Sequence, residues 1–181
     1  LFAKNRKAPD PVVVVSGLPR SGTSMMMKML EAGGLSILTD QIRTADVDNP
    51  KGYYEFERVK QLDKGDHAWL AEASGKVVKV ISALLEHLPP DYTFRVIFVE
   101  RQIAEVLASQ KKMLARRGEP TDRISDDEMA RLFAKHVQKV KVWLSAQPNF
   151  AVLYVDYNRM LADPLPYVRQ INQFLGGKLD E

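Results

Sequence analysis

The chain has 181 residues, of which 45% are hydrophobic and 27% charged, so it can bury a core and nothing in it indicates disorder. Its 26 Lys and Arg against 23 Asp and Glu give a formal charge of +3, which mildly favours anionic ligands and is too small to indicate nucleic acid. It has no cysteine, which excludes disulfides and thiolate chemistry, and no apolar run approaches the ~18 residues of a membrane span. We expect a single domain over residues 1–181, with 1–11 as an N-terminal extension, a cytoplasmic location and an undetermined oligomeric state.

A strand, a loop and a helix are predicted at the start of the chain. The apolar run from Val12 to Ser16 lacks the alternation of a half-exposed strand, so it predicts a strand buried on both faces, as in a parallel sheet. Residues 23–33 predict a helix that ends at Gly33 and Gly34. The loop between them has the position that a phosphate-binding loop needs, after a strand and before a helix N-terminus.

The rest of the chain alternates between strands and helices. Residues 35–54 are rich in turn residues and predict a loop over the sheet edge. Strands are predicted over 76–80, 95–99 and 150–155. Helices are predicted over 55–64, a short segment that ends at His87, 103–116, 126–145, 158–162 and 165–175. The helix over 126–145 has Ser125 as its N-cap, and Glu128 completes a capping box. This order predicts an α/β three-layer sandwich with a central, mostly parallel sheet of four to five strands and a P-loop-like phosphate-binding loop.

The loop of residues 17–24, GLPRSGTS, has groups suited to an anion. The helix N-terminus supplies backbone N–H donors and a partial positive charge, and Arg20 adds a planar fork of donors. The phosphate-binding pattern of ATPases would place a lysine where Thr23 stands, so the sequence disfavours NTP hydrolysis. The alternative is a tight turn that happens to contain glycines.

The same loop resembles the first motif of sulfotransferases that use 3′-phosphoadenosine 5′-phosphosulfate (PAPS). That motif is P-[KR]-S-G-T-[TS], and its six positions are matched by Pro19, Arg20, Ser21, Gly22, Thr23 and Ser24. With arginine at its second position, the motif resembles the form found in the branch of the family that acts on protein tyrosine and on glycans. The resemblance implies that these six residues bind the cosubstrate PAPS, with 3′-phosphoadenosine 5′-phosphate (PAP) as the product.

Two later stretches extend the resemblance to about residues 12 to 175. Arg101 at a strand end and Ser109 eight residues later resemble the second motif, which implies that they bind the 3′-phosphate of PAPS; here Gln102 and Ile103 replace the usual Asn-Pro. Alone, the pair could be a strand arginine and a helix serine. Residues 152–164 resemble the late strand and the Y-E-x-L-x-x-D-P signature. The glycine- and lysine-rich C-terminal loop of the family is not evident, so either adenine is held differently or the chain is a fragment cut at its C-terminus.

The resemblance also implies roles in the chemistry, which needs no metal. Lys79 would stabilise the leaving oxygen and Arg20 the transferring group, although Lys79 could be a surface lysine. Cytosolic relatives have a histidine where Ile81 stands, so the base must come from elsewhere. Residues 49–55, NPKGYYE, resemble a segment that supplies a glutamate, which implies Glu55 as the base. Glu55 could instead be a first-turn helix residue, with Asp40, Asp46 and Glu57 in reserve.

The function expected is transfer of a sulfuryl group from PAPS to a hydroxyl of a small-molecule, glycan or peptide acceptor. One alternative is a P-loop small-molecule kinase or NTPase, in which Glu100 or Asp156 would bind Mg²⁺. The other is a non-catalytic nucleotide-binding module. The three histidines, His67, His87 and His136, show no metal-binding spacing and no triad with a serine.

Overall fold

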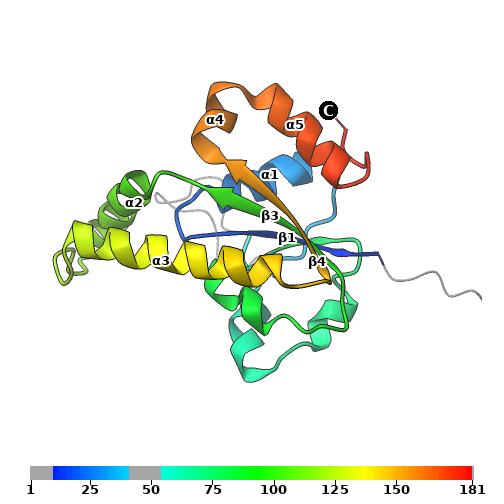
Figure 1. Ribbon diagram of the computed structural model, residues 1–181, viewed down its shortest axis with the longest axis horizontal. Helices are drawn as coiled ribbons and strands as arrows, with labels where there is room; N and C mark the ends of the chain where they lie inside the picture. Colours follow the sequence, from blue (N-terminus) through cyan, green and yellow to red (C-terminus); the bar gives the residue numbers. More distant parts are fainter. Residues whose placement is uncertain (1–9, 41–53, 181) are drawn as a thin grey trace, which may run out of the picture.

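The computed structural model describes residues 10–40 and 54–180, and it contains a parallel sheet (Figure 1). The four strands are β1 (Val12–Gly17), β2 (Val77–Lys79), β3 (Phe94–Glu100) and β4 (Phe150–Asp156), in the order β2-β1-β3-β4. All neighbours are parallel, with Val14 beside Val78 on one side and Val96 on the other. The predicted parallel sheet of four to five strands is therefore confirmed.

The helices close to the predicted ranges are α1 (Thr23–Ala32), α2 (Ile103–Arg116), α3 (Asp126–Ser145), α4 (Tyr157–Ala162) and α5 (Pro164–Phe174). Three 3₁₀ helices complete the described elements: η1 (Glu57–Lys64), η2 (Ala68–Ala71) and η3 (Ser82–His87). The prediction of a helix from Glu55 was wrong in its start, and η2 was not predicted. Val59 and Leu62 are the buried residues of η1, and their spacing of three suits the 3₁₀ period.

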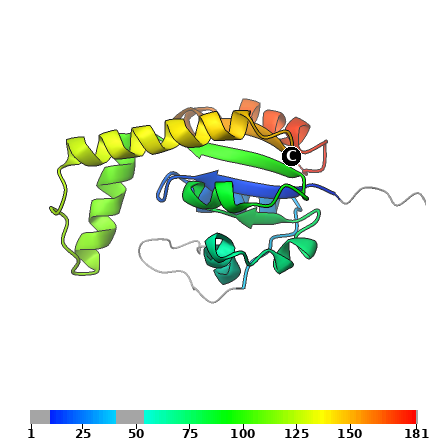
Figure 2. The same ribbon diagram turned by 60° about the horizontal axis from the view of Figure 1, so that its bottom comes forward.

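Alternate residues of β1 enter two separate cores, which explains the continuous valine run. Val12 and Val14 pack under η1, η2, η3 and α3, whereas Val13 and Val15 pack under α1, α4 and α5. In Figure 2, α3 (yellow) runs along the top of the view and the 3₁₀ helices (teal) lie at the bottom; both cover the face of the sheet to which Val12 and Val14 belong. Because every residue of β1 is buried, the expectation of a strand covered on both faces is confirmed.

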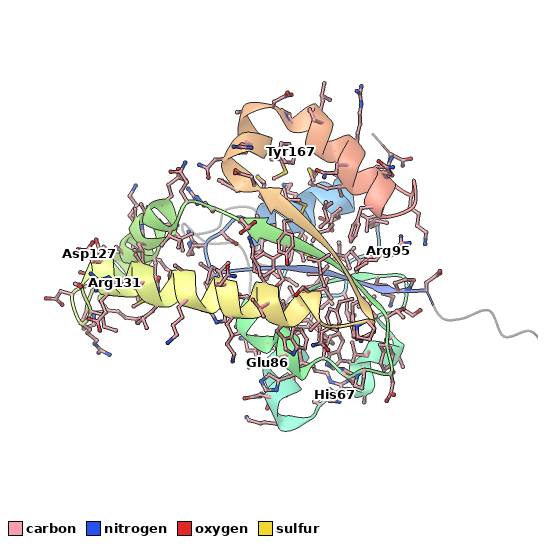
Figure 3. All side chains as sticks on the ribbon, viewed as in Figure 1. His67, Glu86, Arg95, Asp127, Arg131 and Tyr167 are labelled. Atoms are coloured by element: carbon pink, nitrogen blue, oxygen red, sulfur yellow. The ribbon has the colours of Figure 1, made fainter. Side chains whose placement is uncertain are left out.

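Helices α2 and α3 extend beyond the carboxyl edge of the sheet, where all four strands end (Figure 1). Ser125 caps α3, since its Oγ accepts a hydrogen bond of 3.2 Å from the backbone N–H of Glu128. Figure 3 shows Asp127 and Arg131 at the resulting tip, away from the sheet. None of the helices in the two described ranges has the length and apolarity needed to cross a bilayer.

Candidate functional site

The loop between β1 and α1 has a backbone that requires glycine. Gly22 has φ 103° and precedes α1, and a Cβ at this position would overlap the ring of Tyr157. A Cβ on Gly17 would lie 2.6 Å from the carbonyl oxygen of Val99. Arg20 also has a positive φ, 71°. The loop is therefore packed closely against the end of β3 and the start of α4, and these contacts leave no room for a side chain at Gly17 or Gly22.

A cavity of about 450 Å³ lies at the carboxyl edge of the sheet, and five parts of the chain line it. Its lining comprises Pro19, Arg20, Gly22, Thr23, Ser24, Met25, Glu55, Lys79, Ile81, Arg101, Ser109, Gln110, Met113, Arg117 and Tyr157. The structure thus brings together every site residue expected from the sequence except Ser21. Ser21 is 1% exposed, and its Oγ has no hydrogen-bond partner in the described structure. It lines a separate cavity of about 270 Å³ on the side of α3.

Hydrogen bonds connect the first loop to the second motif. Arg20 Nε donates to Ser109 Oγ at 2.9 Å, although the two residues are 89 positions apart. Arg101 Nη1 donates to the carbonyl oxygen of Arg20 at 3.2 Å. The two groups of anion-binding candidates therefore form one connected cluster inside the shared cavity.

Arg101 is oriented from three directions. Its Nε donates to Glu105 Oε2 at 2.8 Å, and Asn158 Nδ2 donates to the other oxygen of Glu105 at 2.7 Å. Its guanidinium lies 4.6 Å from the centre of the Tyr157 ring. The hydrogen bond from Arg101, and then that from Asn158, hold the pKa of Glu105 below its ordinary value. Glu105 is thus ionised at neutral pH and fixes the direction of the Arg101 fork.

Lys79 and Glu55 line the cavity beside the start of α1. Lys79 Nζ lies 3.4 Å from Ser24 Oγ, to which it donates. The side chain of Glu55 is 21% exposed and has Lys60 Nζ at 3.7 Å. Glu55 precedes η1, which begins at Glu57, so the reading of Glu55 as a first-turn helix residue is wrong.

The reserve carboxylates are placed differently. Asp40 Oδ2 accepts a 2.6 Å hydrogen bond from the backbone N–H of Glu57, and neither residue lines the cavity. Asp46 and residues 49–53 of the glutamate segment lie outside the described residues. Among the described carboxylates, Glu55 is accordingly the one in the lining.

The carboxylates of the kinase alternative take part in structural interactions. Glu100 Oε1 lies 2.6 Å from Lys141 Nζ, and Asp156 Oδ1 accepts a 3.0 Å hydrogen bond from the backbone N–H of Arg159 at the start of α4. Within residues 10–40 and 54–180, His, Asp and Glu side chains form no group of three that could hold a metal ion.

The prediction from the sequence left out six residues of the lining: Met25, Ile81, Gln110, Met113, Arg117 and Tyr157. Met113 on α2 and Arg117 directly after it follow Ser109 at intervals of four residues, and this helical spacing was a usable signal. Tyr157 is the first residue of the Y-E-x-L-x-x-D-P signature, to which no role in the site was assigned. His136 Nε2 lies 2.8 Å from Ser82 Oγ, a contact between residues 54 positions apart that the sequence did not reveal.

Comparisons with known proteins agree with this geometry. A family model described as a sulfotransferase domain matches residues 10–181. Sulfotransferase STF1 from Mycobacterium tuberculosis H37Rv has a similar structure, with a TM-score of 0.59, 17% identity, and coverage of 93% of this chain and 68% of that one. Mouse sulfotransferase SULT7A1 complexed with PAP gives a TM-score of 0.54 and 18% identity over 94% of this chain and 59% of that one. Retinol dehydratase in complex with androsterone and inactive cofactor PAP gives a TM-score of 0.51 and 17% identity, with coverage of 93% of this chain and 60% of that one.

The chain thus spans about two thirds or less of the length of these three structures. At such identities the likeness concerns the fold. No curated protein sequence matches the chain significantly.

Proposed function

The chain belongs to the sulfotransferase domain family, and from this premise we propose that it transfers a sulfuryl group from PAPS to an acceptor hydroxyl and releases PAP. One observation carries the proposal. The first loop and the pair of Arg101 and Ser109 line one cavity and are joined by hydrogen bonds, as two anionic ends of one nucleotide require. We also propose that residues 1–181 act as one domain.

The two ends of PAPS would be held by different donors. Backbone N–H groups at the start of α1, with Thr23 and Ser24, would bind the 5′-phosphosulfate, because a helix N-terminus attracts anions. Arg101 and Ser109 would bind the 3′-phosphate. Arg20 lies between the two ends, since it donates to Ser109 from the first loop.

The transfer needs a base and a positive field. Glu55 would take the acceptor proton while the acceptor oxygen bonds to sulfur and the bond from sulfur to the 5′-phosphate oxygen breaks. The electron pair of that bond stays on the phosphate oxygen of PAP, where Lys79 would stabilise the developing charge. Lys79 suits this role because it already lies at the start of α1, 3.4 Å from Ser24 Oγ. The scheme uses no metal ion.

Thermal shift and kinetics test the proposal. We expect PAP to raise the melting temperature and ATP with Mg²⁺ to leave it nearly unchanged, because a ligand that binds only the folded state stabilises it. With PAPS and a panel of phenols, we expect Glu55→Gln to lower turnover at least tenfold and to keep PAP affinity. Glu57→Gln is the matched control, because Glu57 lies nearby and outside the lining. Stabilisation by ATP with Mg²⁺ alone would favour the kinase, and unchanged turnover in Glu55→Gln would place the base elsewhere.

A further inference from the structure

The cavity continues along α2 beyond the residues that would bind PAPS. Ser109, Met113 and Arg117 line it at intervals of four residues, so one face of the helix is turned toward it. At the α-helical rise, Arg117 lies ~12 Å beyond Ser109 along the axis. Figure 2 shows α2 beyond the carboxyl edge of the sheet, with its first turn next to the end of β3 and its last turn farther away.

Arg117 adds a positive charge at the far end of this face. Among the described lining residues, four are cations and one, Glu55, is a carboxylate. The other three cations are close to the donor loop: Arg20 contacts Ser109, Arg101 contacts the Arg20 carbonyl, and Lys79 contacts Ser24. Arg117 therefore supplies positive charge at a distance from the phosphosulfate loop.

A structural explanation of Arg117 is that cations are favoured at helix C-termini. Arg116 is also exposed and is the last residue of α2, so the same preference applies to it. Only Arg117 of the two lines the cavity. The two neighbouring arginines therefore differ in whether they reach the cavity, which makes Arg116 the matched comparison for Arg117.

The wall between the two ends includes apolar side chains. Met25, Ile81 and Met113 line the cavity, and Ile81 is 43% exposed although it is large and hydrophobic. Ile81 also follows Lys79 by two residues, near the proposed site of transfer. An apolar ligand surface would cover such residues, and methionines adapt readily to its shape.

We propose that the acceptor is a hydroxyl compound with an apolar body and an anionic group, and that Arg117 binds the anionic group and sets the specificity for it. The inference rests on the proposed function and adds the class of acceptor to it. The apolar body lies against Met25, Ile81 and Met113, and the hydroxyl lies at Glu55. A charged guanidinium is well suited to a carboxylate, sulfate or phosphate.

Matched acceptors test the inference. The probes are 4-hydroxyphenyl alkanoates of increasing chain length, each with the amide of the same length, and the rate of PAP formation from PAPS is measured. We expect the carboxylate of at least one length to exceed its amide about 10- to 100-fold in kcat/KM, the range of a charge-assisted hydrogen bond. Arg117→Gln should remove this preference, mainly through KM, and Arg116→Gln should keep it. Both variants should bind PAP as the wild type does.

Several results would overturn the inference. If Arg117→Gln weakens PAP binding strongly, Arg117 belongs to the donor site. If Arg116→Gln loses the preference for carboxylates equally, the preference comes from the net positive charge of the region and not from binding by Arg117. Preference for the amides, or no turnover of any carboxylate by an enzyme that binds PAP, also contradicts it. Failure of the wild type to bind PAP would instead remove the proposed function and the inference with it.

Discussion

Substitution of Arg101 by alanine should separate recognition of PAP from recognition of AMP, which lacks the 3′-phosphate. The prediction follows from the placement of Arg101 in the cavity with Ser109 and from its fixed orientation by Glu105. If Arg101 binds the 3′-phosphate, its loss affects one nucleotide and largely spares the other.

The expected magnitude follows from the donors of Arg101. A guanidinium has five N–H donors, and Arg101 directs one to Glu105 and one to the Arg20 carbonyl, so three can meet a phosphate. Two charge-assisted hydrogen bonds at about 1.5 kcal/mol each, the low end because the side chain is 22% exposed, give about 3 kcal/mol. That corresponds to about a 100-fold rise in the Kd of PAP from the lost phosphate bonds. The bond to the Arg20 carbonyl is lost with either nucleotide and adds about a fivefold rise to both constants, so PAP should be weakened about 100-fold more than AMP.

Isothermal titration calorimetry of both nucleotides measures the two constants, and the melting temperature verifies the fold. Arg95→Ala is the matched control, because Arg95 is an arginine on the same strand and Figure 3 shows it at the opposite end of β3. It should leave both constants unchanged. Equal weakening of PAP and AMP in Arg101→Ala would refute the assignment of Arg101 to the 3′-phosphate.

Three further predictions concern the loop, the acidic pH range and the core. Gly22→Ala should weaken PAP binding more than tenfold, because the added Cβ overlaps Tyr157 and φ is 103°; unchanged calorimetric binding would contradict the loop geometry. The pKa of Glu105 is lowered in the folded state, so the stabilisation by this carboxylate is fully present above its ordinary pKa and is lost as the pH falls through the lowered pKa. Urea unfolding at several acidic pH values should show that Glu105→Gln reduces this loss of stability, and parallel curves for the two proteins would count against it. Leu30→Ala should lower the free energy of unfolding by about 2–5 kcal/mol, because Leu30 is fully buried between α1 and the sheet; a change below 1 kcal/mol in chemical unfolding would mean that the site collapses.

The sequence predicted those elements whose signals are local. The valine run predicted β1, and the helical period together with the Ser125 cap placed α3 within its observed range. The segment of η1 was predicted as a helix without its type, because an eight-residue segment with two buried positions fits two helical periods. Short elements such as η2 depend on tertiary contacts, here the burial of Trp69 and Leu70, which no local pattern reveals.

For the candidate site, the sequence named residues and missed the interactions between them. The spacing of Arg101 and Ser109 is visible along the chain, and their shared cavity with the first loop follows from parallel strands that end at one edge. The contact of Asn158 with Glu105 spans 53 positions and depends on how α4 packs beside α2. The roles of these residues in binding and catalysis stay predictions until the variants are measured.

The hydrogen bond from Arg20 to Ser109 means that the two halves of the donor site are not independent in evolution. A lineage that loses one partner removes much of what the other contributes, so the second loss costs less than it would alone, which is epistasis of the kind that contacting residues show. We therefore expect the arginine and the serine to be inherited or discarded as a pair, and a transplant of the first loop into another scaffold to require its distant serine as well.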